Sequence, residues 1–150
     1  MKKFELTSES IVNIFGKKLY RIKALVEFGN VKEGELGGFV EKEENLSHEG
    51  NAWVYGDARV YGDARVYGNA WVCGNAWVYG NADYATVKGF GTEYRTTTFF
   101  KCRDGVTRVK CGCFYGDLVE FRNQVKNTRK GKIAEEYLMI ADLMEKHFDK

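Results

Sequence analysis

The chain has 150 residues, 23 of them basic and 21 acidic, and its net charge of +2 does not by itself indicate a strongly acidic or basic partner. No apolar run approaches the ~20 residues of a membrane-spanning helix, which excludes an integral membrane protein of the helical kind. The polar residues that soon follow Met1 are not typical of a signal peptide. We therefore expect a cytoplasmic protein without membrane contact, in which the four Cys are reduced thiols.

Charge and pattern divide the chain into three segments. Residues 1–85 contain 10 basic and 12 acidic residues, whereas residues 86–150 contain 13 basic and 9 acidic residues, so the C-terminal part is the one that could attract an anion. We expect an N-terminal cap with a degenerate first coil at 1–49, a repeat region at 50–91, and a hairpin and helix-pair module at 92–150.

The first segment predicts a β-hairpin that leads into the repeats. Strand-like runs at 11–15 and 19–25 flank the turn signal Gly16-Lys17-Lys18. Counting back in sixes from the first repeat reaches Leu46 and Val40, which are both apolar and are therefore expected to point inward.

Six consecutive hexapeptides, GNAWVY, GDARVY, GDARVY, GNAWVC, GNAWVY and GNADYA, occupy residues 50–85. A fixed short period of this kind is typical of a repeat architecture. Ala and Val lie two residues apart in each of the first five units, so they are expected to share the inner side of a strand. Gly followed by Asn or Asp predicts the bend between units, because these residues tolerate positive φ.

The hexapeptides resemble those of the hexapeptide-repeat proteins, whose fold is the left-handed parallel β-helix with three hexapeptides in each coil. The resemblance implies a mainly β fold: a short left-handed parallel β-helix with an N-terminal β cap and a C-terminal β-hairpin plus two α-helices. The handedness comes from the resemblance, since parallel crossovers generally favour the right hand.

Outward residues eighteen apart are expected to stack on neighbouring coils. Trp53 would then lie over Trp71, Arg59 over Trp77, and Tyr61 over Tyr79. Large apolar patches are rarely left bare, so we expect the C-terminal module or another subunit to cover the Trp53 and Trp71 face. A free aromatic binding platform is the alternative.

The C-terminal segment predicts a hairpin followed by two helices. Asp104-Gly105 lies between two strand-like runs, which is a strong hairpin signal. A two-residue turn would place four cations on one face, namely Lys101, Arg103, Arg108 and Lys110, where they could bind a phosphate group. Arg95 is included in this predicted anion site. An ordinary solvated strand face is the alternative. Asp117 is expected to cap a first helix, and apolar residues at 133–148 keep the spacing of a second.

Enzymatic and metal-dependent functions have weaker support. Hexapeptide-repeat acyltransferases use a His as general base, and His48 is the one that could serve, although a capping role fits it better. Cys102, Cys111 and Cys113 lack the spacing of a zinc site and are expected to be buried thiols, while the role of Cys73 stays open. We therefore predict no catalytic residue, no metal and no cofactor.

Stretches outside the repeats extend the resemblance. Four stretches resemble the corresponding segments of a family of phage and prophage hexapeptide-repeat proteins, which are described as transferases or polymer-forming proteins. These stretches are residues 19–25, 34–47, 96–101 and 109–116. The resemblance implies a phage-type homo-oligomer, most simply a trimer. Our hypothesis is a non-catalytic inhibitor of bacterial antiviral defence that sequesters a nucleotide signal or blocks a defence protein. An acyltransferase that uses CoA and a structural or assembly protein are the alternatives.

Overall fold

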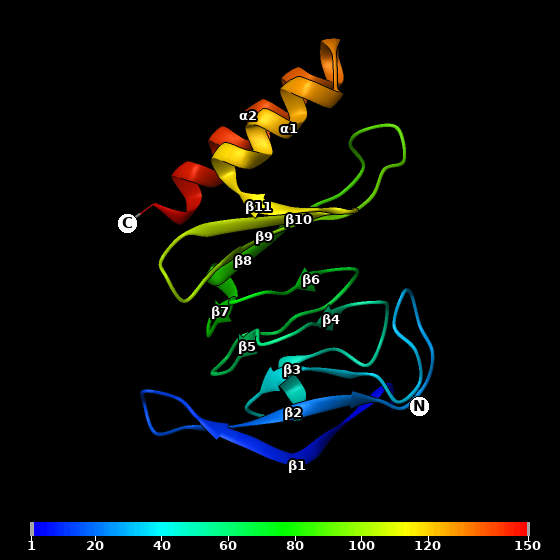
Figure 1. Cartoon of the computed structure of the whole chain (residues 1–150), viewed down its shortest axis with the longest axis vertical. Coiled ribbons are helices and arrows are strands. Elements are labelled where there is room, and N and C mark those ends of the chain that lie inside the picture. Colours follow the sequence, from blue (N-terminus) through cyan, green and yellow to red (C-terminus); the bar gives the residue numbers. More distant parts are fainter. Residues whose placement is uncertain (1, 150) are drawn as a thin grey trace.

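The computed structural model describes residues 2–149 and shows a stack of layers along its long axis (Figure 1). The N-terminal strands lie at one end, the short repeat strands in the middle, and a helix pair at the other end, above an antiparallel sheet. The strands are β1 (Phe4–Val12), β2 (Lys18–Ala24), β3 (Leu36–Val40), β4 (Trp53–Val54), β5 (Arg59–Val60), β6 (Trp71–Val72), β7 (Trp77–Val78), β8 (Tyr84–Val87), β9 (Thr97–Lys101), β10 (Thr107–Cys111) and β11 (Phe114–Asp117), and the helices are α1 (Leu118–Thr128) and α2 (Gly131–Phe148).

The predicted fold class, a left-handed parallel β-helix with caps, is wrong. The strands form three small sheets of different kinds, ordered β1-β2-β3-β5-β7, β11-β10-β9-β8 and β4-β6. The first sheet is mixed, the second is antiparallel, and only the two-stranded third is wholly parallel. Strands β4–β7 of the hexapeptides are only two residues long, because a Gly bend follows almost at once. The longer strands of the flanks pair antiparallel with one another, and β3 also pairs parallel with β5.

The side-chain pattern of the repeats is nevertheless confirmed. All ten Ala and Val residues expected to point inward are at most 1% exposed, and Leu46 and Val40 are buried with them. Gly62 shows why the bends need glycine: its φ is +62°, and a Cβ there would lie 2.6 Å from the carbonyl oxygen of Tyr79. The repeats thus provide a narrow interior that admits only small and medium side chains.

Two of the three stacked pairs expected at a spacing of eighteen residues are present: the Arg59 guanidinium lies 5.4 Å from the Trp77 ring, and the rings of Tyr61 and Tyr79 stack at 5.4 Å. Trp53 and Trp71 pair in parallel register through their backbones, but their rings contact other aromatic residues. Trp53 is covered by a different part of the chain from the one expected, however. Its indole is fully buried because Phe4 and Phe28, from the N-terminal segment, pack edge-on against it.

The C-terminal module forms a second core above the repeats. Asp117 caps α1 by accepting a hydrogen bond from the Glu120 N–H, as the sequence predicts. The helices pack on the outer face of the β8–β11 sheet through the buried residues Phe99, Val109, Leu118, Phe121, Val125, Tyr137, Ile140, Ala141, Met144 and Phe148. Within residues 2–149, neither helix combines the length and the apolar character needed to cross a membrane.

The join between β3 and β5 generates a stability prediction. A Cβ on Gly38 would lie 2.6 Å from the Ala58 carbonyl oxygen and 2.7 Å from Val54 Cγ1, so Gly38→Ala should force the two strands apart. We expect a loss of about 2–3 kcal/mol in the free energy of unfolding, measured by urea denaturation. Leu36→Ala, on the same strand but 53% exposed, is the control and should change it by less than about 0.5 kcal/mol. Equal effects of the two substitutions would contradict the packing of this join.

Candidate anion-binding site

The hairpin register differs from the expected one by one residue. Lys101 pairs with Thr107 and Phe99 with Val109, so the loop contains three residues, 103–105, in place of two. Gly105 has a φ of +81° and donates its N–H to the Cys102 carbonyl at 3.0 Å. A turn closed by a glycine in the left-handed region is the common form of the three-residue hairpin loop.

This shift places the four cations on different faces of the hairpin, so the prediction of a single basic face is wrong. Arg108 and Lys110 point toward the repeats, while Lys101 lies on the side of the helix pair and Arg103 lies in the loop. A shift of one residue in a strand exchanges the faces of all its side chains, which is why the whole cluster separates.

Three of these cations already have partners in the structure. Arg108 binds Asp104 through two hydrogen bonds of 2.9 and 2.8 Å, and this pairing lowers the pKa of Asp104 to about 2. Lys110 lies 5.0 Å above the ring of Trp71, and Lys101 pairs with the buried Asp83 at 3.4 Å. These contacts are structural and leave little charge for a ligand.

Arg103 lies beside the aromatic residues of the repeats. Its guanidinium is 6.0 Å from the ring of Trp77, which Arg59 approaches at 5.4 Å. Lys101, Arg103, Trp77 and Tyr79 line one open groove, so part of the predicted anion site and part of the aromatic ladder come together there. Because two guanidinium groups lie over the Trp77 ring, this ring is poorly suited to stack against a ligand.

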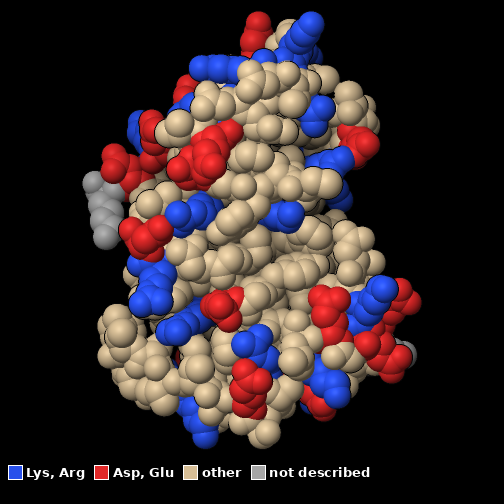
Figure 2. All heavy atoms as spheres, in the orientation of Figure 1, with Lys and Arg blue, Asp and Glu red and all other residues tan. Residues whose placement is uncertain are grey.

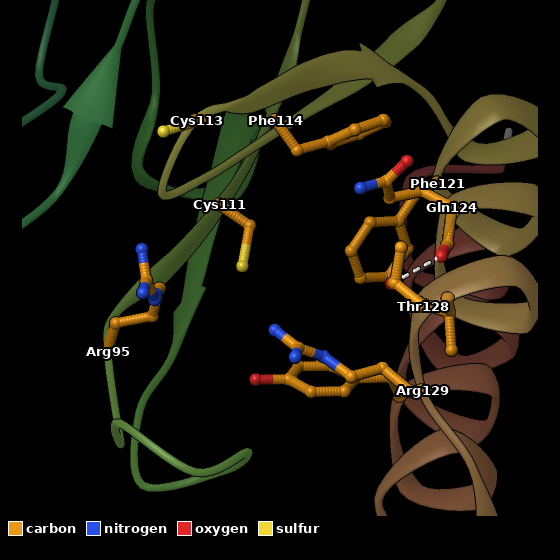
Figure 3. A pocket seen from close by; sticks show the side chains of 10 residues that line it. Arg95, Cys111, Cys113, Phe114, Phe121, Gln124, Thr128 and Arg129 are labelled. Carbon is orange, nitrogen blue, oxygen red and sulfur yellow. Dashed lines mark hydrogen bonds between the residues drawn. The ribbon is translucent and has the colours of Figure 1, made fainter.

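Arg95, the remaining predicted cation, lines a separate cavity of about 230 Å³ between the β10–β11 turn and the helix pair (Figure 3). Arg129, at the end of α1, approaches the cavity from the opposite side. The Cys111 sulfur points into the space between these two arginines, and Phe114 and Phe121 form an aromatic wall. Gln124 and Thr128 of α1 complete the helical side.

The charge around this cavity is positive. Arg95 pairs with the exposed Glu93, whereas no ion pair is formed by Arg129 within residues 2–149. Burial raises the pKa of Tyr137, and Cys111 raises it further. Arg129 and Arg95 lower this pKa, because both cations lie close to the Tyr137 hydroxyl. Residues 121–134 contain five basic and no acidic residues, so the helix link beside the cavity adds to the positive potential.

The rest of the visible surface has no comparable concentration of one sign. In the view of Figure 2, basic and acidic side chains are interspersed, and an uncharged band crosses the middle of the molecule. A ligand attracted by charge would therefore depend on the local arginine pair and not on a broad field.

Sequence reasoning included Arg95 but missed Arg129. The available signal was the run of cations at 126–132. The position of Arg129 across the cavity from Arg95 depends on how α1 packs on the sheet, and no local pattern reveals that packing.

The prediction of buried thiols holds for Cys102 alone among its three cysteines: Cys111 is half-buried, and the prediction is wrong for Cys113, which is exposed. Burial raises the pKa of Cys73 to about 12, and burial also raises that of Cys102, which Arg108 partly opposes. Cys111 accepts a hydrogen bond from the Thr97 hydroxyl at 3.2 Å. In the described part of the chain, no three His, Cys, Asp or Glu residues are arranged to hold a metal ion.

His48 has both ring nitrogens engaged. Nδ1 accepts the backbone N–H of Lys3 at 3.0 Å, so the proton is on Nε2, which donates to Glu43 at 2.7 Å. The ring also stacks on Phe4 at 4.3 Å. This arrangement fixes the N-terminal strand and leaves no free nitrogen to act as a general base.

Comparison with known proteins gave no match, either among models of protein families or among curated proteins.

Lys3, next to His48, generates a prediction about pH. Its ammonium is buried and donates to the Ala52 carbonyl at 2.7 Å, and burial lowers its pKa from 10.5 to about 8. Between these values the unfolded chain binds more protons than the folded one, so this residue makes stability rise with pH. We expect the wild-type protein to gain stability relative to Lys3→Met from pH 8 to 10.5, measured by urea denaturation.

The exposed neighbour provides the control for this experiment. Lys2→Met should show no such change relative to wild type over the same range, because Lys2 remains largely in water. Parallel pH profiles for the wild-type protein and Lys3→Met would contradict the prediction.

Proposed function

We propose that the protein is a non-catalytic binding protein that captures a small anionic ligand of the nucleotide class in the cavity between Arg95 and Arg129. The observation that carries this proposal is the convergence of two guanidinium groups, from distant segments, on one cavity with an aromatic wall. Arginine binds phosphate through paired hydrogen bonds, and aromatic rings stack on planar bases.

The size of the cavity limits the part of the ligand that it encloses. Its volume of about 230 Å³ is below the roughly 300–1,000 Å³ of sites that bury a whole drug-sized ligand. A phosphate with its sugar, or a base with one phosphate, would fit, while the remainder of a larger nucleotide would extend into solvent.

The biological setting of the proposal comes from the resemblance to phage and prophage repeat proteins. A phage-type protein in the bacterial cytoplasm that sequesters a nucleotide signal would weaken an antiviral defence that depends on this signal. We propose that it acts as a homo-oligomer whose simplest ring is a trimer, which a separate two-fold contact could join into pairs. The engaged ring nitrogens of His48 give no support to the acyltransferase alternative.

Calorimetry with a panel of linear and cyclic nucleotides tests the proposal. We expect at least one to bind the wild-type protein, and Arg129→Ala and Arg95→Ala each to weaken it about tenfold or more, because a hydrogen bond to a charged group contributes about 1.5–3 kcal/mol. Lys130→Ala is the matched control: it removes the same charge from the helix link but does not line the cavity.

Two results would overturn the proposal. One is the absence of binding by every nucleotide in the panel, which would leave the blocking of a host defence protein as the better account. The other is an equal loss of affinity in Lys130→Ala and Arg129→Ala, since that would indicate general attraction and no defined site.

A further inference from the structure

The outer face of α2 carries a stripe of four side chains, namely Glu136, Met139, Leu143 and Lys146. Their spacing of three, four and three residues places them along one line of the helix surface. Met139 is 69% exposed and Leu143 is 59% exposed, although both are large and apolar. An alternation of three and four residues is the spacing of a seam between two paired helices.

The stripe has no partner within the described residues, 2–149. The inward face of α2 packs in the C-terminal core through Tyr137, Ile140, Ala141, Met144 and Phe148. Among residues 2–149, neither Glu136 nor Lys146 forms an ion pair, whereas the neighbouring Asp142 and Glu145 both bind Arg122 of α1. The two apolar residues thus lie between one free acidic and one free basic side chain.

We propose that this stripe is the contact surface for a second copy of the same chain, with the two α2 helices antiparallel about a two-fold axis. In that arrangement Met139 lies against Leu143 of the partner subunit, and Glu136 lies against Lys146 of the partner subunit. Both pairs are centred on the same point, beside Ala141, so a single two-fold axis satisfies them together. Each contact then occurs twice, as in any isologous interface.

Charge selects the antiparallel pairing of two copies. In a parallel pairing each Glu136 would face its own counterpart, and so would each Lys146, which like-charge repulsion disfavours. Asp142 lies closest to the proposed axis among the acidic residues beside the stripe, and its bond to Arg122 at 2.9 Å already offsets its charge. The stripe is therefore complementary to itself in one orientation only.

The contact is small and separate from the proposed ligand cavity. Four residues from each copy bury less than a standard protein interface, so the association should be reversible in the micromolar range or weaker. Tyr137, which lines the cavity, projects into the core of the module and not from the stripe. The pairing leaves the cavity open, and it could also join two larger rings formed through other surfaces.

Sedimentation velocity over a range of protein concentrations tests the pairing. The wild-type particle should contain an even number of copies, and Glu136→Lys or Lys146→Glu alone should halve its mass, with a dissociation constant raised about tenfold or more. An equimolar mixture of the two variants should assemble again, because every Lys then faces a Glu of the other variant.

Two exposed residues outside the stripe provide matched controls. Glu33→Lys and Lys126→Glu make the same charge changes and should leave the wild-type mass unaltered. A wild-type particle with one or three copies at every concentration would overturn the proposal, and so would single variants that keep the wild-type mass.

Discussion

The constraint on which the rest of the structure depends is the closure of the two ends of the repeat region. Ala and Val fill its interior, but each end exposes backbone groups that must find hydrogen-bond partners. At one end, the Asn45 side chain donates to the carbonyls of Gly62 and Ala64, and Lys3 donates to Ala52. The N-terminal segment therefore stabilises the repeats directly.

The opposite end is closed by the β8–β11 sheet. The Thr98 hydroxyl accepts the Trp71 N–H at 3.0 Å, and the Arg103 N–H donates to the Asn75 carbonyl at 2.8 Å. Cys102 forms an isolated bridge with Ala76, and Phe100 joins the core of the repeats. The hairpin is predicted to present a basic face for an anion, but Arg108 and Lys110 lie on the inner face that provides this closure.

The elements that the sequence predicts correctly are those with a local cause. Helical spacing at 133–148 and the Asp117 cap depend on residues within one or two turns, and both appear in the structure. The inward Ala and Val positions follow from the two-residue alternation of strands. The prediction of the fold class is wrong because the fold depends on which longer strands pair with the ends of the repeats. The hexapeptides contain no information about these flanking strands.

The register of the hairpin shows why the site was only partly predicted. Asp104-Gly105 fits a loop of two residues or of three, since Gly105 can adopt positive φ in either case. The contact between the hairpin and the repeats favours the longer loop, because Arg103 then binds Asn75 through its backbone. A difference of one residue separates Lys101 from Arg108 and Lys110, and no spacing in the sequence distinguishes the two registers.

The two faces of β9 explain why the cavity with free charge lies on the side of the helices. Thr98 and Phe100 point to the repeats, together with the cations that Asp104 and Trp71 engage. Phe99 points the other way, into the core that supports α1 and α2. Cations on the closing face must be paired or stacked because they lie between two layers, whereas Arg129 follows a helix that extends beyond the sheet. Closure of the repeats thus excludes an open anion site from the inner face and leaves the helix link as the place where unpaired charge can remain.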